Sequence, residues 1–390
     1  MKKSIQYYYL AVLAALILLP VLVFTLLRGH IDTNNYENRL LAEKPVLGQP
    51  INTQTAFPDV VTIENFPGYF DSWFNDHLPF RNQLLSFNGR LDYDVLKSTT
   101  SDVVIIGKEG WLFYKGAQAN AEDPIGDYKG TNLFSDGQLE RIANNMIVAR
   151  DELRERGAEF VIFICPNKER VYSEYMPDAY GEPSQENRMQ QVVDYLRSHT
   201  DIPVVSAYED LMAYKQEHPE QQLYFKYDTH WNDVGAYIGT RTLNETLGFT
   251  QVPFEELTVE DYGMGNFDLA RLLHLGQYLN RDGAYKLYGY TPHEITKTGD
   301  ATGTEFHMST DDTAPGWKLF VIGDSFSTMS LNYYACHYQY AYLNFYYNYQ
   351  LSQLEEEQPS VVVYECVERY LGNMLNFSIT DGIKSEAEPF

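Results

Sequence analysis

Two short stretches carry residues that together could activate a serine for acyl transfer. The first, DTHWN, places Asp228 two residues before His230. The second, GDSFS, places Ser325 just after the apolar run at 318–322. A serine hydroxyl becomes a good nucleophile when a base takes its proton, and the pKa of histidine suits that task near pH 7. An aspartate can hold the histidine tautomer and stabilise the imidazolium, so these residue types fit a Ser–His–Asp triad.

Each stretch also has a structural interpretation. Asp228 could cap a helix that opens at Asn232, which would leave His230 as a surface histidine. Gly-Asp-Ser is common in turns, and Asp324 is predicted to cap the helix that follows it. A strand before Ser325 would place the serine at the carboxyl edge of a parallel sheet, where open α/β folds bind ligands. The N–H groups of the next helix could then stabilise an oxyanion.

The elements that must position these residues follow from hydrophobic patterning. A hairpin is expected at 102–114 and a helix from about 138 to 156, with Ser135 as its N-cap and Gly157 at its end. The predicted strands are 159–166, 202–208, 318–322, 340–346 and 360–366, and further helices are expected at 66–97 with a break at Pro79, at 187–199 and at 232–247. Alternating helices and strands predict an α/β fold with a doubly wound, mainly parallel sheet. Residues 250–315 lack this alternation and are interpreted as an insertion or lid.

The N-terminus predicts a membrane anchor. Lys2 and Lys3 precede an apolar run at 7–27, and about 21 helical residues span a bilayer core of roughly 30 Å. The lysines favour a cytoplasmic N-terminus, so the rest of the chain is expected to be periplasmic or extracellular. The alternative, a cleaved signal peptide, is disfavoured by the length of the run. The expected organisation is an anchor at 1–28, a linker at 29–65 and a catalytic domain at 66–390 that contains the insertion.

Charge and cysteine content exclude several functions. The net charge of −25 argues against nucleic acid as a partner and against anionic lipid beyond the anchor. Cys165, Cys336 and Cys366 are far apart in the sequence and are predicted to be buried thiols rather than a disulfide framework. None of the Cys or His spacings resembles a zinc site, so neither a metal nor a cofactor is predicted.

DTHWN and GDSFS occur within a longer ordered series of stretches. The series also contains ENR at 37–39, HLPFRNQL at 77–84, IGKEGWLFY at 106–114, CPNKERVY at 165–172 and ECVERYL at 365–371. Over roughly residues 35–375 the chain resembles the SGNH-hydrolase-like family of alginate O-acetyltransferases (AlgX/AlgJ-like proteins) and its relatives with a DHHW motif. The resemblance implies a triad of Ser325 as nucleophile, His230 as base and Asp228 as orienting acid.

The resemblance also implies a reaction and partners. Such proteins move acetyl groups onto hydroxyls of an exported or cell-surface polysaccharide, beside a multi-pass membrane acyltransferase that supplies the acetyl group. The same acyl-serine could instead be resolved by water in a deacetylase or esterase. A third possibility is a non-catalytic glycan-binding partner of the acyltransferase. The acidic composition argues against alginate itself as the acceptor.

Four further residues are candidates for substrate or transition-state binding, each with a structural alternative. Asn167 could join the Ser325 backbone N–H as an oxyanion donor, or serve as a cap or turn residue. Trp231 could stack on a sugar ring or pack into the core. Arg369 and Tyr370 follow the last predicted strand and could bind substrate, or an ion pair could hold that strand end. Lys168 and Arg170 are weaker candidates at the same edge of the sheet.

Overall fold

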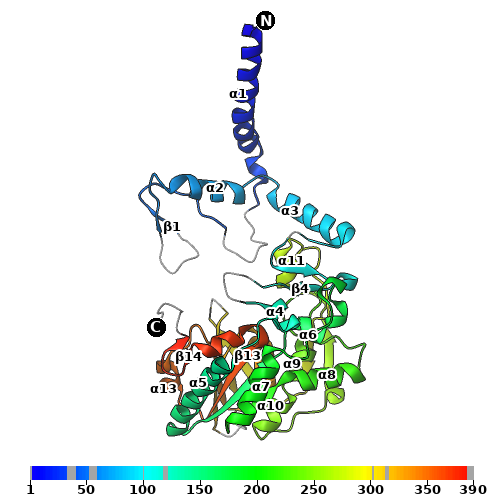
Figure 1. The fold of residues 1–390 in the computed structure, drawn as a ribbon, viewed down its shortest axis with the longest axis vertical. Helices are drawn as coiled ribbons and strands as arrows, with labels where there is room; N and C mark the ends of the chain where they lie inside the picture. Colours follow the sequence, from blue (N-terminus) through cyan, green and yellow to red (C-terminus); the bar gives the residue numbers. More distant parts are fainter. Residues whose placement is uncertain are drawn as a thin grey trace. The chain divides into compact units, whose positions relative to one another are not determined.

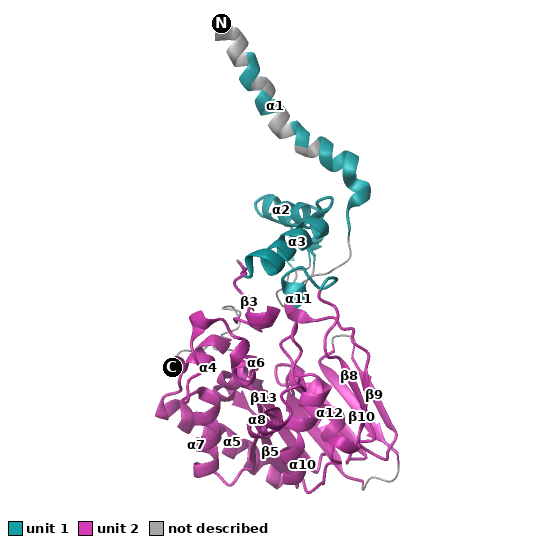
Figure 2. Ribbon diagram, turned by 90° about the vertical axis from the view of Figure 1, so that its right-hand side faces the viewer, with its two compact units in different colours: residues 1–97, 270–278 teal, residues 98–269, 279–390 magenta. Residues whose placement is uncertain are grey.

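The computed structural model describes residues 2–32, 41–51, 59–99, 101–116, 122–300, 303–311 and 316–383. The chain divides into two compact units, which are coloured separately in Figure 2. Residues 1–97 and 270–278 form the first unit, and residues 98–269 and 279–390 form the second. The predicted catalytic residues all belong to the second unit.

The first unit contains the N-terminal helix and the broken helix expected at 66–97. Its elements are α1 (Lys2–Leu27), a 3₁₀ turn (Arg28–His30), β1 (Pro50–Ile51), β2 (Asp59–Val60), α2 (Phe66–Asp76), α3 (Arg81–Arg90) and a π-helical segment (Leu91–Leu96). Pro79 lies between α2 and α3, because proline cannot continue a helix. Among the described residues, no helix combines the length and the apolar character needed to cross a bilayer. The predicted transmembrane helix is therefore unconfirmed.

A seven-stranded sheet forms the centre of the second unit, in the order β6-β5-β13-β11-β12-β10-β9. The first five strands in this order are parallel to one another, β10 pairs antiparallel with β12, and β9 pairs antiparallel with β10. The strands are β5 (Glu159–Cys165), β6 (Val204–Ser206), β9 (Ile295–Gly299), β10 (Glu305–Thr310), β11 (Lys318–Gly323), β12 (Tyr340–Phe345) and β13 (Val361–Val367). This confirms the mainly parallel α/β sheet (Figure 1).

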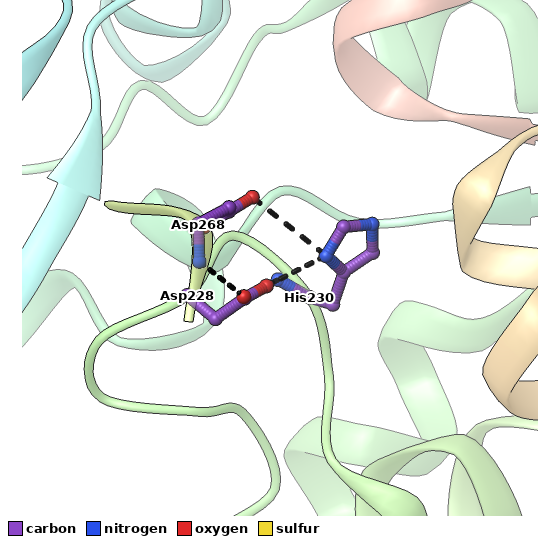
Figure 3. A group of neighbouring side chains, drawn as sticks. All are labelled: Asp228, His230 and Asp268. Atoms are coloured by element: carbon purple, nitrogen blue, oxygen red, sulfur yellow. Dashed lines mark hydrogen bonds and ion pairs between the residues drawn. The ribbon is translucent and has the colours of Figure 1, made fainter. Parts of the chain in front are cut away.

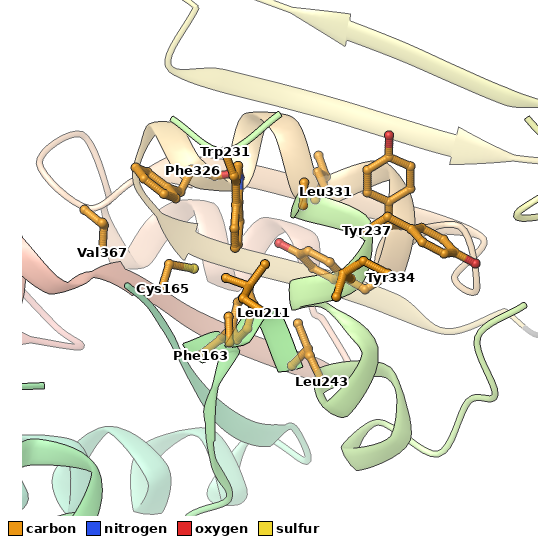
Figure 4. Close-up of a cluster of buried hydrophobic side chains, with 14 of the residues drawn as sticks. Phe163, Cys165, Leu211, Trp231, Tyr237, Leu243, Phe326, Leu331, Tyr334 and Val367 are labelled. Atoms are coloured by element: carbon orange, nitrogen blue, oxygen red, sulfur yellow. The ribbon is translucent and has the colours of Figure 1, made fainter. Parts of the chain in front are cut away.

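Helices cover both faces of the sheet, as a doubly wound fold requires. On one face, alternate residues of β5 such as Phe163 pack with side chains from α8 (Ala207–Glu217), α9 (Asp233–Gly239), α10 (Arg241–Thr246) and α12 (Ser325–Ala335). Figure 4 shows part of this cluster. On the other face, Ile162 and its neighbours pack against α5 (Asp136–Glu155), α7 (Arg188–His199) and α13 (Leu351–Glu357). Burial on both faces explains why β5 is a continuous apolar run.

Shorter elements complete the second unit. They are β3 (Val104–Ile106), β4 (Leu112–Tyr114), α4 (Pro124–Lys129), α6 (Lys168–Val171), β7 (Thr258–Asp261), β8 (Tyr285–Tyr288), β14 (Phe377–Ser378), β15 (Gly382–Ile383) and 3₁₀ segments at Lys108–Gly110, Ser173–Tyr175, Asp178–Tyr180, Phe254–Glu256 and Glu368–Leu375. Strands β3 and β4 pair as the predicted hairpin. Helix α11 (Asp268–Leu272) begins in the second unit and continues into residues assigned to the first.

Local sequence signals explain the elements that were predicted well. The Ser135 hydroxyl accepts a hydrogen bond from the Gln138 backbone N–H, and the Gln138 side-chain oxygen accepts one from the Ser135 backbone N–H, which forms a capping box. Gly157 follows α5 with a φ of 80°, in the left-handed region that favours glycine.

Two expectations differ from the structure. The helix expected at 232–247 is interrupted at Thr240, whose hydroxyl donates to the Tyr237 carbonyl. Part of the segment at 250–315 is not a separate lid, since β9 and β10 extend the central sheet. The edge strand β9 and its neighbour β10 alternate only weakly between buried and exposed residues, and this left no clear strand signal in the sequence.

All three cysteines are free and buried, which confirms the prediction of buried thiols. Burial raises the pKa of the Cys336 thiol to about 12. Burial also raises the pKa of the Cys165 and Cys366 thiols well above their ordinary value, and nearby carboxylates add to this effect.

Candidate active site

The structure brings Asp228, His230 and Ser325 together in hydrogen-bonded order. His230 Nε2 lies 2.7 Å from Ser325 Oγ, and His230 Nδ1 lies 2.7 Å from Asp228 Oδ1. With its proton on Nδ1, the imidazole donates to Asp228 and can accept from the serine hydroxyl. This is the geometry that a general base and its orienting acid require.

Ser325 is placed by a strand, a turn and a helix. It is the first residue of α12 and follows β11 after Asp324. Asp324 caps the helix as predicted, since its Oδ1 accepts the Phe326 N–H at 2.9 Å. Its Oδ2 accepts the Val367 N–H at 2.9 Å, which ties the start of α12 to the end of β13. The serine therefore sits at the carboxyl edge of two adjacent parallel strands.

A buried lysine organises the loop that carries the acid and the base. Lys168 is 1% exposed, and its ammonium donates to the Phe225 carbonyl at 3.1 Å and to the Asp228 carbonyl at 2.5 Å. The loop is closed by a bridge between Tyr224 and Trp231. Burial lowers the pKa of Lys168 to about 8 despite several nearby carboxylates. The contacts place Lys168 in a supporting role for the loop.

The contact between Asp228 and His230 shifts the pKa of each residue, and the shifts favour an ionised aspartate and a more basic histidine. Burial acts to raise the pKa of Asp228, but the hydrogen bond and charge of His230 outweigh it and lower the pKa. Burial acts to lower the pKa of His230, but Asp228 and then the charge of Asp268 raise it above its ordinary value. The charge of Arg369 acts in the lowering direction. A base of raised pKa accepts the serine proton more readily.

Asp268 is a third neighbour that sequence reasoning missed. Its Oδ2 lies 3.9 Å from His230 Nδ1, and Figure 3 shows this contact as a dashed line. Asp228, His230 and Asp268 each offer one atom within 4.8 Å of the others, which is close enough to hold a metal ion. The facing atoms of His230 and Asp228 are already at hydrogen-bond distance, and the oxygens of Asp268 accept from Thr229. Hydrogen bonds therefore explain why Asp228, His230 and Asp268 lie close together, without a metal ion.

Trp231 packs into the core and offers no surface to a sugar. It is fully buried, and its indole N–H donates to the Phe326 carbonyl at 3.2 Å. Figure 4 shows the indole beside Phe326 and above Phe163. A side chain at residue 239 would clash, because a Cβ on Gly239 would lie 2.9 Å from the indole ring. The substrate-binding prediction for Trp231 is corrected to the packing alternative.

Asn167 links the ends of two strands. It is 1% exposed, and its backbone N–H donates to the Glu368 carboxylate at 3.0 Å. Its side-chain oxygen accepts the Arg369 N–H at 3.2 Å, while its Nδ2 lies 3.4 Å from Asp127 Oδ2. These contacts support the structural alternative, and a role as oxyanion donor stays a prediction.

Arg369 and Tyr370 lie beside the turn that carries Ser325. The Arg369 guanidinium is 5.3 Å from the Phe326 ring centre and 5.1 Å from that of Tyr370. Within the described residues its Nε has no hydrogen-bond partner. The ion pair at this strand end is made instead by Arg170 and Glu368, at 2.9 Å. The Arg369 Nε–H, near the residue that follows Ser325, could therefore donate a hydrogen bond to a substrate. Substrate binding by Arg369 and Tyr370 stays a prediction.

Comparison with known proteins identifies the family of this chain. A family model described as the SGNH hydrolase-like domain of the acetyltransferase AlgX matches residues 104–345. This chain belongs to that SGNH hydrolase-like acetyltransferase family. The matched range contains Asp228, His230 and Ser325, whereas Arg369 and Tyr370 lie beyond it. Of the stretches that suggested the resemblance, ENR at 37–39 falls outside the described residues.

A curated relative matches part of the sequence, and two solved structures share the fold. The probable alginate O-acetylase AlgJ of Pseudomonas putida is 26% identical over 145 residues, which cover 37% of this chain and 34% of that protein. Bacillus cereus PatB1 shares the fold with a TM-score of 0.51 and 17% identity, over 71% of this chain and 100% of that chain. A DHHW family protein from Eubacterium siraeum aligns with a TM-score of 0.50 and 13% identity, over 72% of this chain and 99% of that one.

Proposed function

We propose that the protein is an O-acetyltransferase that moves acetyl groups onto hydroxyls of a polysaccharide through an acyl-Ser325 intermediate. The observation that carries the proposal is the Asp228–His230–Ser325 chain, with 2.7 Å at each link, in a domain of the SGNH hydrolase-like acetyltransferase family. The intact chain of contacts also disfavours a non-catalytic glycan-binding role.

In the first half of the proposed reaction, Ser325 Oγ attacks the carbonyl carbon of the acetyl donor while its proton passes to His230 Nε2. The imidazolium is stabilised by Asp228, which accepts its Nδ1–H. The oxyanion forms beside the first turn of α12, where the Ser325 N–H is one of the groups that a helix leaves without an intrahelical acceptor. Collapse expels the leaving group of the donor, which takes the proton from His230 and leaves acetyl-Ser325.

In the second half, a sugar hydroxyl takes the place of the donor. It attacks the acetyl carbonyl while its proton passes to His230, and collapse returns that proton to Ser325 Oγ. Attack by water on the same intermediate would give an esterase or deacetylase, so the acceptor decides the outcome. The name of the AlgJ relative favours alginate, whereas the net charge of −25 disfavours a polyanion. Acceptors of both kinds therefore belong in the test.

The proposal includes a place in the cell. The apolar run at 7–27 after two lysines supports a single-pass anchor with the catalytic domain outside the cytoplasm. A multi-pass membrane acyltransferase would then supply acetyl groups across the bilayer. We expect the full chain to stay with membranes after alkaline carbonate washing and to be cleaved by protease added from outside. Release by carbonate would contradict the anchor.

The catalytic proposal is tested with the full chain and acetyl-nitrophenyl ester, with and without alginate or a neutral polysaccharide. Nitrophenol release should fall by at least about a thousandfold in Ser325→Ala. The exposed Ser352→Ala on α13 should react like the parent. Acetyl transfer to an acceptor, measured by mass spectrometry, is expected. Release that no acceptor changes would favour the esterase, and release unaffected by Ser325→Ala would overturn the triad.

A further inference from the structure

A second carboxylate approaches the imidazole from the side opposite Ser325. Asp228 Oδ1 lies 2.7 Å from His230 Nδ1, and Asp268 Oδ2 lies 3.9 Å from the same nitrogen. Asp268 comes from the segment at 250–315 rather than from the loop that carries Asp228 and His230. Figure 3 shows both aspartates facing the imidazole. A histidine needs one acceptor to fix its tautomer, so the second carboxylate calls for an explanation.

We propose that Asp268 is a positioning residue that holds Asp228 and His230 in their reactive arrangement and lends its charge to the imidazolium. Three hydrogen bonds carry the positioning part. The Asp268 backbone N–H donates to Asp228 Oδ2 at 2.7 Å. The Asp268 carboxylate accepts the Thr229 N–H at 2.8 Å and the Thr229 hydroxyl at 2.6 Å. The proposal rests on the triad proposed above and adds a fourth residue to it.

These bonds fix the rotation of the Asp228 carboxylate. Its Oδ1 accepts from His230 Nδ1 at 2.7 Å and from the His230 backbone N–H at 3.1 Å, so that oxygen is fully used. Its Oδ2 is held by Asp268, which prevents the carboxylate from turning away from the ring. Thr229 lies between the acid and the base in sequence, and its two bonds to Asp268 fix their spacing. Small displacements of a catalytic group reduce rates strongly.

Charge adds to the effect of position. The main charges that act on His230 are Asp228 from its own loop, Asp268 from the start of α11 and Arg369 from beyond β13. Ser325 lies at the other ring nitrogen, and Asp324, just before it, also interacts with the charge of His230. The two aspartates raise the pKa of the imidazole and Arg369 lowers it. Burial and then the charge of Asp228 raise the pKa of Asp268 to about 6. At neutral pH both aspartates therefore favour the imidazolium that forms when Ser325 loses its proton.

The test compares Asp268→Asn with a matched aspartate variant. The asparagine keeps the backbone N–H and an oxygen that can accept from Thr229, and it removes the charge. Asp282 is the control, because it also accepts backbone N–H groups of the same loop, from Lys226 and from Tyr227 at 3.3 Å. Its charge is not among the main influences on His230.

We expect Asp268→Asn to lower kcat/KM for the nitrophenyl ester by about tenfold, mainly through kcat. The acid limb of its pH profile should move down by about one unit, since a neighbouring opposite charge is lost. Asp282→Asn should leave that limb in place. Thermal unfolding measured in parallel identifies loss of fold. An unchanged limb in Asp268→Asn, or an equal shift in Asp282→Asn, would overturn the proposal.

A second measurement does not depend on activity. NMR titration of the His230 ring should give a lower pKa in Asp268→Asn than in the parent chain, and the same pKa in Asp282→Asn. If Ser325→Ala has no effect on ester cleavage, the proposed function fails whatever the NMR result. If Ser325→Ala is inactive but the His230 titration does not respond to Asp268→Asn, only the role of Asp268 fails.

Discussion

Two pairs of acidic residues lie near Ser325, and the structure shifts the pKa values of Asp228 in one pair and Glu365 in the other in opposite directions. Asp228 and Asp268 face His230, whereas Asp324 follows β11 just before Ser325 and Glu365 lies within the neighbouring strand β13. In the first pair, His230 and nearby N–H groups lower the pKa of Asp228. In the second, burial and the charge of Asp324 raise the pKa of Glu365 to about 8. The contrast is sharpest between Asp228, whose pKa the contact with His230 lowers, and Glu365, which has no cation among the main influences on its pKa.

Asp228 and Glu365 therefore have different roles. Asp228 acts through its negative charge, which stabilises the imidazolium form of His230. Glu365 acts through its shape, because its Oε2 accepts the Asp324 N–H at 2.9 Å and the Ser327 hydroxyl at 2.6 Å, and it can do both while protonated. Removing the charge of Asp228 should thus lower activity strongly, whereas removing the charge of Glu365 should leave activity nearly unchanged. The following substitutions test that difference, from the largest expected effect to the smallest.

Asp228→Asn should have the largest effect on activity. The amide would donate toward Nδ1, and this favours the tautomer with a proton on Nε2, which cannot accept from Ser325. We expect kcat for ester cleavage to fall by about 10³ to 10⁴. Asp233→Asn is a suitable control, since Asp233 Oδ1 accepts from the Tyr333 hydroxyl at 2.8 Å and an asparagine oxygen can replace it. A loss below tenfold in Asp228→Asn would show that charge at this position is dispensable.

Asp324→Ala should affect stability more than chemistry. It removes the cap of α12 and leaves the buried Val367 N–H without its acceptor. We expect the free energy of unfolding in urea to fall by about 2–3 kcal/mol. Ser135→Ala removes an exposed cap on α5 and should cost about 1 kcal/mol. Equal losses in the two variants would mean that the bond to Val367 adds nothing.

Glu365→Gln should have the smallest effect on activity, within about threefold at pH 7, because glutamine resembles a protonated glutamate. The effect of this substitution should instead appear in the pH dependence of the free energy of unfolding. The carboxyl of Glu365 has its ordinary pKa in the unfolded chain and a pKa of about 8 in the folded one. Between these values the folded chain binds the extra proton, so this residue makes stability fall as pH rises toward about 8.

That pH dependence is measured from unfolding midpoints of the parent and of Glu365→Gln between pH 5 and about 8.5. The difference between the two chains isolates Glu365 from other acids. We expect the glutamine variant to gain relative stability as pH rises. A constant difference across the range would show that Glu365 is ionised throughout, and the contrast between the two pairs would then disappear.

The proposed triad could be predicted because its signals are local to two short stretches, which the resemblance joined. Ser325 follows an apolar strand and opens a helix in one stretch, and Asp228 and His230 are two residues apart in the other. Trp231 could not be decided in the same way. Its position depends on Phe163, which comes from a strand nearly seventy residues earlier.

Asp268 gave no signal because its contacts depend on tertiary structure. It lies in a segment without clear periodicity and meets Thr229 only after the chain has folded back. The same reason applies to β9 and β10, which were missed because they join the sheet as an edge whose pattern of burial is weak. The fold class, by contrast, follows from strands that are apolar on both faces, and such runs stand out in any sequence.

Because all three cysteines are buried, the folded chain should not react with thiol reagents. Maleimides and other alkylating reagents attack accessible thiolates, and none of these three side chains offers one. Alkylation would therefore report opening of the core, with Cys165 on one face of the sheet and Cys366 on the other. A single cysteine introduced on the surface would carry a fluorophore or spin label without background. The untreated chain is thus already suited to following polysaccharide binding or movement of the site by spectroscopy.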